Sequence, residues 1–308
     1  MNICVTGGAG FIGSHLVDRL IDLGHTVLVI DNLVTGVREF VNTKATFIEM
    51  DIRNPKLSDV LCEHKIEYMF HEAAQTMVPM SMECPQYDCD VNLMGLINVL
   101  NACRQCKVKK ILMPSSAAVY GDNTHLPLTE DQIGVPSSFY GLTKLTAEGY
   151  LRIYEAAFGL RYICYRYSNV YGPRQGDGGE GGVISIFGRL ASKGKNFTIF
   201  GDGEQTRDFV YVHDVVEANI QGMLHEDVTG IFNVSTNTGV TVNALLEHFR
   251  RLSGKDISVT YEPERVGDIR HSCLCNEKAE KLLKFKATME LSKGLGLTYD
   301  YFQAVKKD

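Results

Sequence analysis

A tyrosine and a lysine four residues apart, Tyr140 and Lys144, are the residues whose types and spacing could do chemistry. On a helix this spacing places the phenol and the ammonium on one face. A free tyrosine has a pKa of about 10, and a nearby ammonium lowers it because it stabilises the phenolate. Ser115 and Ser116 follow an apolar run that ends at Met113, so a serine can face the pair from a strand terminus. Together these side chains suit the removal of a proton from a sugar or alcohol hydroxyl while a hydride leaves the same carbon.

A glycine-rich turn lies close to the first residue. Since Tyr-x-x-x-Lys also occurs on the surface of ordinary amphipathic helices, its neighbours decide what it means. The strand expected over residues 1–6 runs into Gly7, Gly10 and Gly13, and a helix with regularly spaced apolar residues follows. Glycines at such a junction permit a tight turn and let a pyrophosphate approach the helix N-terminus. The turn therefore predicts a dinucleotide site.

An acidic residue, Asp31, ends the next expected strand, over residues 25–30. A carboxylate at this point can accept hydrogen bonds from the ribose hydroxyls of an adenosine. Its charge would repel a 2′-phosphate, and neither Asn32 nor Leu33 is an arginine. An aspartate that merely ends a strand is the alternative, but the complete strand–turn–helix–strand unit favours binding of NAD over NADP.

Strands and helices alternate along the first half of the chain. Beyond the first two, the expected strands cover residues 45–50, 68–74, 109–116 and 161–167. This alternation predicts an α/β fold of the Rossmann type, a doubly wound parallel sheet with helices on both faces. The ligand crevice of such a sheet lies at the carboxyl ends of the strands. There Asp51 and Ile52 could flank an adenine, and Ala73 could let the backbone pass under a cofactor.

The composition changes after Arg174, where a glycine-rich loop begins. Shorter strands and helices follow, and there is no internal repeat. We predict an NAD-binding domain over residues 1–170, joined by returning segments around 204–238. A smaller α/β substrate-binding domain is expected from residues 171–203 and 239–308.

Three arginines, Arg207, Arg265 and Arg270, lie in loops or at strand edges of this second half. Each could simply form a surface salt bridge. Arginine, however, binds a diphosphate in bidentate fashion. As a set, the three arginines indicate a second phosphate-bearing ligand besides NAD.

The composition excludes several classes of protein. The 308 residues are 44% hydrophobic and 22% charged, which is ordinary for a globular protein. A net charge of −6 gives no reason to expect nucleic-acid binding. No apolar segment approaches the roughly 18 residues of a membrane span, and no signal peptide is recognisable at the start. We therefore expect a cytoplasmic protein with no membrane partner.

Nine cysteines are scattered along the chain. Cys103-x-x-Cys106 could be a redox pair or half of a zinc site. The pair lies within an expected helix, however, and no second Cys-x-x-Cys completes four ligands. No His/Cys/Asp cluster has metal-ligand spacing. The sequence thus predicts no metal site, and nine reduced thiols as in a reducing compartment.

Seven segments together closely resemble the extended short-chain dehydrogenase/reductase family, in particular its nucleotide-sugar epimerases. The resemblance spans essentially the whole chain and keeps the family's order of motifs. The segments are Thr6–Ser14, His71–Gln75, Ser115–Gly121, Tyr140–Lys144, Arg166–Gln175, Gly201–Phe209 and Arg265–Asp268.

The resemblance implies two ligands and an oligomeric state. It implies that NAD is held by Gly7, Gly10, Phe11, Ile12, Gly13, Asp31, Asn32, Asp51, Ile52, Ala73, Gln75, Asn92, Tyr140, Lys144 and Tyr167. It implies that a UDP-sugar is held by Ser116, Asn169, Val183, Thr198, Phe200, Arg207, Arg265, Asp268 and Ser272. Family members form dimers through a four-helix bundle, so a homodimer is expected through the helices over residues 87–106 and 139–158.

The same resemblance implies a mechanism. Tyr140, helped by Ser116 and Lys144, would remove the proton of the sugar C4 hydroxyl while hydride passes to the nicotinamide and later returns to the other face. Dehydratases of the family need an acid pair directly after the catalytic Ser or Thr, and UDP-glucuronate decarboxylases need a Glu there. This chain has Ala117 and Ala118 instead. Epimerisation needs no such carboxylate, so we expect 4-epimerisation of a UDP-hexose.

The choice of sugar depends on two positions. Ser272 stands where a bulky aromatic residue blocks N-acetylated sugars in relatives, so UDP-GlcNAc and UDP-GalNAc are expected substrates beside UDP-glucose and UDP-galactose. Ser168 replaces a common Phe, which leaves a UDP-glucuronate 4-epimerase as an alternative. A nucleotide-sugar reductase or dehydrogenase with a net redox product is another. A non-catalytic NAD-binding regulator would be expected to lack Ser116, Tyr140 and Lys144, which are all present.

Overall fold

The computed structural model describes residues 1–132, 134–176, 182–264 and 269–305. Within them, a seven-stranded parallel sheet forms the centre of the molecule, in the order β10-β6-β5-β4-β1-β2-β3. Its strands are β1 Asn2–Thr6, β2 Thr26–Asp31, β3 Thr46–Glu49, β4 Tyr68–His71, β5 Lys110–Ser116, β6 Arg161–Tyr167 and β10 Gly230–Val234. The doubly wound Rossmann-type sheet expected from the alternation of elements is confirmed.

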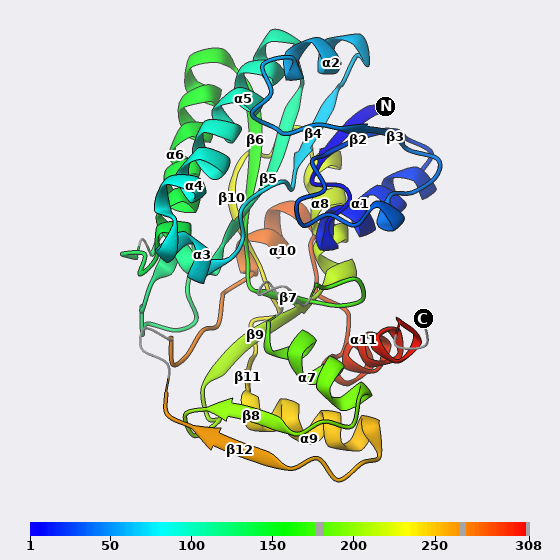
Figure 1. The fold of residues 1–308 in the computed structure, drawn as a ribbon. Coiled ribbons are helices and arrows are strands. Elements are labelled where there is room, and N and C mark those ends of the chain that lie inside the picture. Colours follow the sequence, from blue (N-terminus) through cyan, green and yellow to red (C-terminus); the bar gives the residue numbers. More distant parts are fainter. Residues whose placement is uncertain (133, 177–181, 265–268, 306–308) are drawn as a thin grey trace.

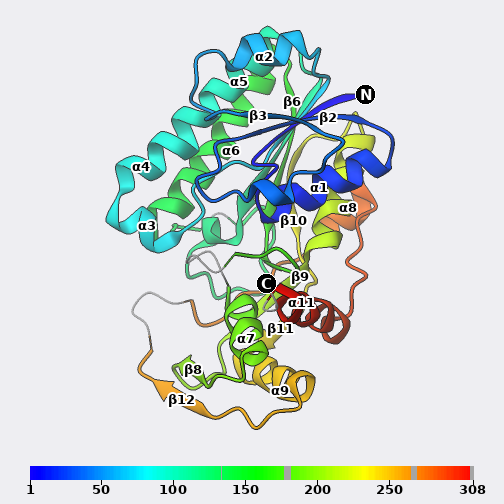
Figure 2. The same ribbon diagram turned by 45° about the vertical axis from the view of Figure 1, so that its right-hand side comes forward.

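Helices cover both faces of this sheet (Figures 1 and 2). On one face lie α1 Phe11–Asp22, α8 Val212–Leu224 and α10 Glu277–Leu283, and on the other lie α2 Leu57–Glu63, α5 Gly95–Gln105 and α6 Phe139–Phe158. Successive side chains of a strand point to opposite faces. Phe70 and Leu112 therefore pack in the first core, whereas Met69 and Ile111 pack in the second.

A smaller lobe lies below the carboxyl ends of the strands (Figure 1). In the described part of the chain it contains a three-stranded sheet, β11-β9-β7, and a two-stranded sheet, β12-β8. Its elements are β7 Asn169–Tyr171, α7 Val183–Ser192, β8 Phe197–Phe200, β9 Thr206–Tyr211, β11 Gly239–Thr241, α9 Val242–Ser253, β12 Val259–Glu262 and α11 Leu291–Val305. A third core, in which Phe187 stacks on Phe197 and Phe249 meets both rings edge-on, holds the lobe together.

The long helix expected over residues 87–106 is interrupted. It consists of α4 Pro85–Cys89, a π-helical turn Asp90–Met94, and α5. A π turn inserts an extra residue into the helix and often marks a functional site. Short elements that the sequence did not predict are α3 Val78–Glu83, the 3-10 turns Arg38–Phe40 and Ala117–Tyr120, and strands β7 and β11.

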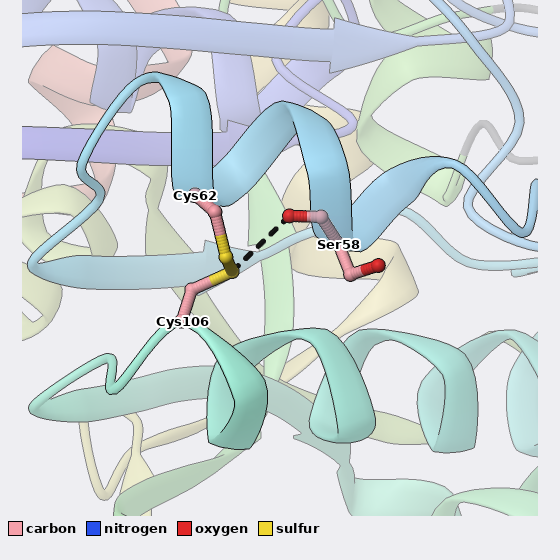
Figure 3. Close-up of a disulfide and its surroundings, with 3 residues drawn as sticks. All are labelled: Ser58, Cys62 and Cys106. Carbon is pink, nitrogen blue, oxygen red and sulfur yellow. Dashed lines mark hydrogen bonds between the residues drawn. A yellow bond between two sulfur atoms is a disulfide. The ribbon is translucent and has the colours of Figure 1, made fainter.

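The expectation of nine reduced thiols was wrong for one pair. Cys62 of α2 and Cys106, which follows α5, form a disulfide with their Cα atoms 5.0 Å apart (Figure 3). The partner of Cys106 is therefore not Cys103, which is buried and unpaired. The two bonded cysteines are 44 residues apart. Only the packing of α2 beside α5 brings them together.

Candidate active site

A cavity of about 410 Å³ opens at the carboxyl ends of the central strands. Its lining contains every residue predicted to hold a dinucleotide except Asn92, and it also contains Ser116. The predicted residues in the lining are Gly7, Gly10, Phe11, Ile12, Gly13, Asp31, Asn32, Asp51, Ile52, Ala73, Gln75, Tyr140, Lys144 and Tyr167. Residues between Gly7 and Tyr167 thus converge on one volume.

The glycine turn leaves no room for side chains. Gly7 has φ +71°, and a Cβ on it would lie 2.6 Å from the backbone nitrogen of Ala73. A Cβ on Gly13 would lie 2.2 Å from the carbonyl oxygen of Gly7. Gly10 is the N-cap of α1, whose first-turn N–H groups therefore face the cavity side of the turn. This cradle fits a pyrophosphate, which such a helix N-terminus binds through N–H groups and the helix dipole.

The acids at the ends of β2 and β3 are held by the chain itself. Asp31 accepts hydrogen bonds from the backbone N–H of Ala9 (3.0 Å) and of Leu33 (2.9 Å). Asp51 pairs with Arg53 at 2.8 Å and accepts a bond from the Asn32 amide. The hydrogen bond from Arg53 holds the pKa of the Asp51 carboxyl well below its usual range. The hydrogen bonds to Asp31 and the ion pair of Asp51 with Arg53 thus position both carboxyl groups at the cavity wall.

Asn92 supports the cavity without lining it. From the π turn its side chain accepts a bond from the Gln75 N–H (2.9 Å) and donates to the Gln75 carbonyl oxygen (3.0 Å) and to Asp88. Asp88 in turn accepts a bond from Thr143 of α6 at 2.7 Å. The network fixes the segment after β4 against α6.

The three residues predicted to do chemistry meet at one end of the cavity. Lys144 Nζ lies 5.8 Å from the centre of the Tyr140 ring and donates to the Pro114 carbonyl oxygen at 3.0 Å. Ser116 Oγ accepts a bond from the Ala118 N–H at 3.2 Å. Burial lowers the pKa of Lys144. The carboxyl end of β5 and the N-terminal half of α6 therefore present a hydroxyl, a phenol and an amine to the same space.

The position of α6 follows from its own sequence. Ser138 caps the helix by accepting a bond from the Gly141 N–H at 3.1 Å, as serine does at N-caps. Gly159 ends it in the left-handed conformation, φ 71°. A Cβ on Gly141 would lie 2.7 Å from the Ala118 carbonyl oxygen. The helix start is therefore packed directly against the turn that follows Ser116.

A second cavity of about 240 Å³ adjoins the first and shares Ser116 and Tyr140 with it. Among the residues predicted to hold a substrate, Asn169 lines this cavity, and Val183 lies between the lining residues Gly182 and Ile184. Other predicted substrate residues are not in the lining of either cavity, namely Thr198, Phe200, Arg207 and Ser272. Arg265 and Asp268 lie outside the described residues.

Glu72 is a site residue to which the sequence assigned no role. It lines the first cavity directly after β4, and its N–H donates to the Thr6 carbonyl oxygen at 3.0 Å. Its Oε1 atom is buried and has no hydrogen-bond partner within the described residues. Burial raises the pKa of Glu72 to about 7, against the opposing charge of Lys144. An acid at the end of an otherwise apolar strand was the available signal.

Two absences hold for the described residues. No group of three or more His, Cys, Asp or Glu side chains there is arranged to hold a metal ion. None of the helices described is both long and apolar enough to cross a membrane.

A parallel sheet with a glycine turn, and a Ser–Tyr–Lys set at its carboxyl edge, define the extended short-chain dehydrogenase/reductase class. Within that class the chain belongs to the NAD dependent epimerase/dehydratase family, whose model matches residues 3–235. The resemblance inferred from the motifs is confirmed.

Known proteins resemble the chain along nearly its whole length. A putative UDP-glucose 4-epimerase of Methanocaldococcus jannaschii is 42% identical, with 95% of each chain covered. The structure of a Thermotoga maritima UDP-glucose 4-epimerase with UDP-glucose matches with a TM-score of 0.96 at 42% identity, over 99% of this chain and 100% of that one. A UDP-N-acetylglucosamine 4-epimerase of Methanobrevibacter ruminantium, in complex with UDP-N-acetylmuramic acid, matches with a TM-score of 0.94 at 36% identity, over 99% and 98%.

Proposed function

We propose that the protein is an NAD-dependent 4-epimerase of UDP-hexoses, an isomerase that acts through a transient 4-keto sugar. One observation carries the proposal: Ser116 and Tyr140 line both cavities, so they lie where a dinucleotide and a second ligand would meet. The narrow glycine cradle and the two aspartates in the lining of the first cavity, Asp31 and Asp51, fit NAD. Bound there, NAD would supply a reversible hydride acceptor for the sugar C4.

The residues of the chain take distinct roles in this reaction. Tyr140, as a phenolate, removes the proton of the C4 hydroxyl and later returns it. Ser116 hydrogen-bonds the same oxygen and holds it near the phenol. The charge of Lys144, 5.8 Å from the Tyr140 ring, favours the phenolate. The uridine diphosphate stays bound while the 4-keto sugar rotates about its bonds to the diphosphate. The opposite face of C4 is then presented for return of the hydride.

The lining of the second cavity supports epimerisation over elimination. Ala117 and Ala118 form a 3-10 turn directly after Ser116 and carry no acid. No Asp, Glu or His is found among the described residues that line this cavity. Loss of water from the sugar would need an additional proton donor and acceptor there, whereas epimerisation needs only the one proton that Tyr140 carries.

The two parts of the chain are proposed to bind different ligands. Residues 1–170, with β10 and the segments around 204–238, hold NAD, whereas residues 171–203 and 239–308 hold the UDP-sugar. In support, α8 packs on the central sheet and β10 belongs to it, whereas the bounds differ at β7 and β9, which pair with each other in the smaller lobe. The residues proposed to hold the UDP-sugar are Ser116, Asn169, Val183, the backbone near Thr198 and Phe200, Arg207, Arg265, Asp268 and Ser272.

The sugar is UDP-glucose or UDP-galactose, with UDP-GlcNAc and UDP-GalNAc also accepted because Ser272 is small. The alternatives are UDP-glucuronate 4-epimerisation and a net reduction or oxidation of a nucleotide sugar. The test uses purified protein without added cofactor, incubated separately with UDP-galactose, UDP-GlcNAc and UDP-glucuronate, with the anomeric protons followed by NMR. A C4 epimer is expected from the first two. If none of the three converts even with NAD supplied, the proposal is wrong.

A homodimer and a cytoplasmic location complete the proposal. Exposed apolar side chains support the dimer, because Leu142 and Ile153 of α6 are three helical turns apart on one face and Met94 is exposed just before α5. Ile153→Glu should convert a dimer to a monomer in light scattering. The unpaired, exposed Cys84 and Cys89 suit a reducing compartment, whereas the Cys62–Cys106 bond does not, and cell fractionation tests the location.

A further inference from the structure

An ion pair is buried directly behind the reacting residues. Glu148 of α6 and Arg166 of β6 have side chains only 2% and 1% exposed. Arg166 Nε donates to Glu148 Oε1 at 2.9 Å, and its Nη2 donates to Oε2 at 2.8 Å. Such a bidentate pair fixes both the distance and the relative orientation of the two groups. The pair therefore couples the helix of Tyr140 rigidly to a central strand.

The pair also reaches the segments on either side of Ser116. Ser115 Oγ donates to Glu148 Oε1 at 2.7 Å. The Arg166 guanidinium lies 4.7 Å from the ring of Tyr120, in the turn that follows Ser116, and donates to the Glu130 carbonyl oxygen at 3.1 Å. Strand β5, the turn after it, the loop that precedes α6 and α6 itself are thus all bonded to one ion pair.

The spacing on α6 explains what this arrangement can do. Tyr140, Lys144 and Glu148 follow one another at intervals of four residues, so they lie along one face of the helix. That face is tied to β5 at two points, Lys144 to Pro114 at 3.0 Å and Glu148 to Ser115 at 2.7 Å. Two ties along one face fix both the rotation and the axial position of a helix.

We propose that Glu148 and Arg166 are positioning residues that hold Ser116 and Tyr140 at the separation the reaction requires. The proposal rests on the proposed function. Stability alone does not account for the pair, because replacing a buried ion pair by apolar residues of similar size is often neutral or stabilising. Removing one partner, in contrast, leaves the other charge buried without its counter-charge and destabilises the fold.

The double variant Glu148→Leu/Arg166→Met separates the two roles. We expect a melting temperature within a few degrees of the wild type. The kcat for UDP-galactose should fall at least about tenfold, while KM changes less than about twofold because the diphosphate is bound elsewhere. A kcat within twofold of the wild type in a folded double variant overturns the proposal. The matched control is Arg161→Met, because Arg161 lies on the same strand as Arg166 but forms an exposed ion pair, with Asp227. This variant should keep the wild-type kcat.

Two further measurements cover the other outcomes. If the double variant does not fold, Arg166→Lys keeps the charge but lacks the bidentate fork, and an unchanged kcat there overturns the proposal. If the wild type epimerises no sugar, the proposed function fails by itself. Positioning is then tested by NMR of [13Cζ]-tyrosine-labelled protein, with Tyr140→Phe used to assign the Tyr140 signal. The Tyr140 signal should titrate differently in wild type and double variant, and identical titrations overturn the proposal.

Discussion

Replacing Glu72 by glutamine should remove a pH dependence of stability that the cavity builds into the fold. The Oε1 atom of Glu72 is buried without a partner among the described residues, although the residue as a whole is partly exposed along the cavity. Burial raises its pKa from an ordinary value near 4.5 to about 7. The groups facing it are Lys144 of α6 and the phenols of Tyr165 and Tyr167 on β6.

Proton linkage sets the direction in which the free energy of unfolding changes with pH. Between pH 4.5 and 7 the folded protein holds a proton on Glu72 that the unfolded chain has released, so the free energy of unfolding falls as pH rises. The difference between the two pKa values corresponds to at most about 3 kcal/mol, reached above pH 7. This free energy is an upper limit, because Glu72 is partly exposed and solvent reduces the effect of burial on its pKa. Glutamine resembles the protonated acid and carries no such penalty.

The assay is urea unfolding of wild type and Glu72→Gln at several pH values from 4.5 to 8.5. The unfolding free energy of the variant minus that of the wild type should be smallest at pH 4.5 and should rise by up to about 3 kcal/mol by pH 8. Glu63→Gln, an exposed residue of α2, is the control. A difference that stays flat over the whole range would refute the reasoning, since Glu72 would then ionise alike in both states.

Three other perturbations test the site and the fold. Tyr140→Phe should lower kcat by about 10²–10⁴-fold, the usual contribution of a general acid–base catalyst. The affinity for UDP, measured by calorimetry, should not change. A smaller loss of kcat would show that Tyr140 is not the general base. Gly13→Ala would place a Cβ 2.2 Å from the Gly7 carbonyl oxygen, so the purified variant should lack the NAD released from wild type on denaturation. Breaking the Cys62–Cys106 bond, whose partners are 44 residues apart, should cost about 4 kcal/mol of unfolding free energy through loop entropy, and equal urea midpoints with and without reductant would contradict this.

Local signals made several elements predictable. Strand β6 spans Arg161–Tyr167 and α6 spans Phe139–Phe158, as expected. The helix ends at Gly159, whose left-handed conformation a glycine adopts without strain. The glycine turn was recognisable because three glycines, each at a position with little room for a side chain, fall within seven residues of one another. For the same reason most of the predicted dinucleotide residues line one cavity.

Other features had no local signal. The π turn over Asp90–Met94 arises where Asn92 must reach the backbone of Gln75. Strands β7 and β11, of three residues each, exist only because β9 pairs with both of them. Sequence spacing could not anticipate these contacts, since each depends on a partner far along the chain.

By itself the sequence determined the fold class, the family and the residues that meet at the carboxyl ends of the strands, because these depend on periodicity and on motifs that need only their neighbours. The tertiary structure alone decided three further properties. It set the burial of Glu72, the Glu148–Arg166 pair behind Ser115, and the Cys62–Cys106 bond. Each of the three depends on the local dielectric or on the distance between segments that are far apart in the chain. Tertiary packing sets these two quantities, and no short stretch of the sequence encodes them.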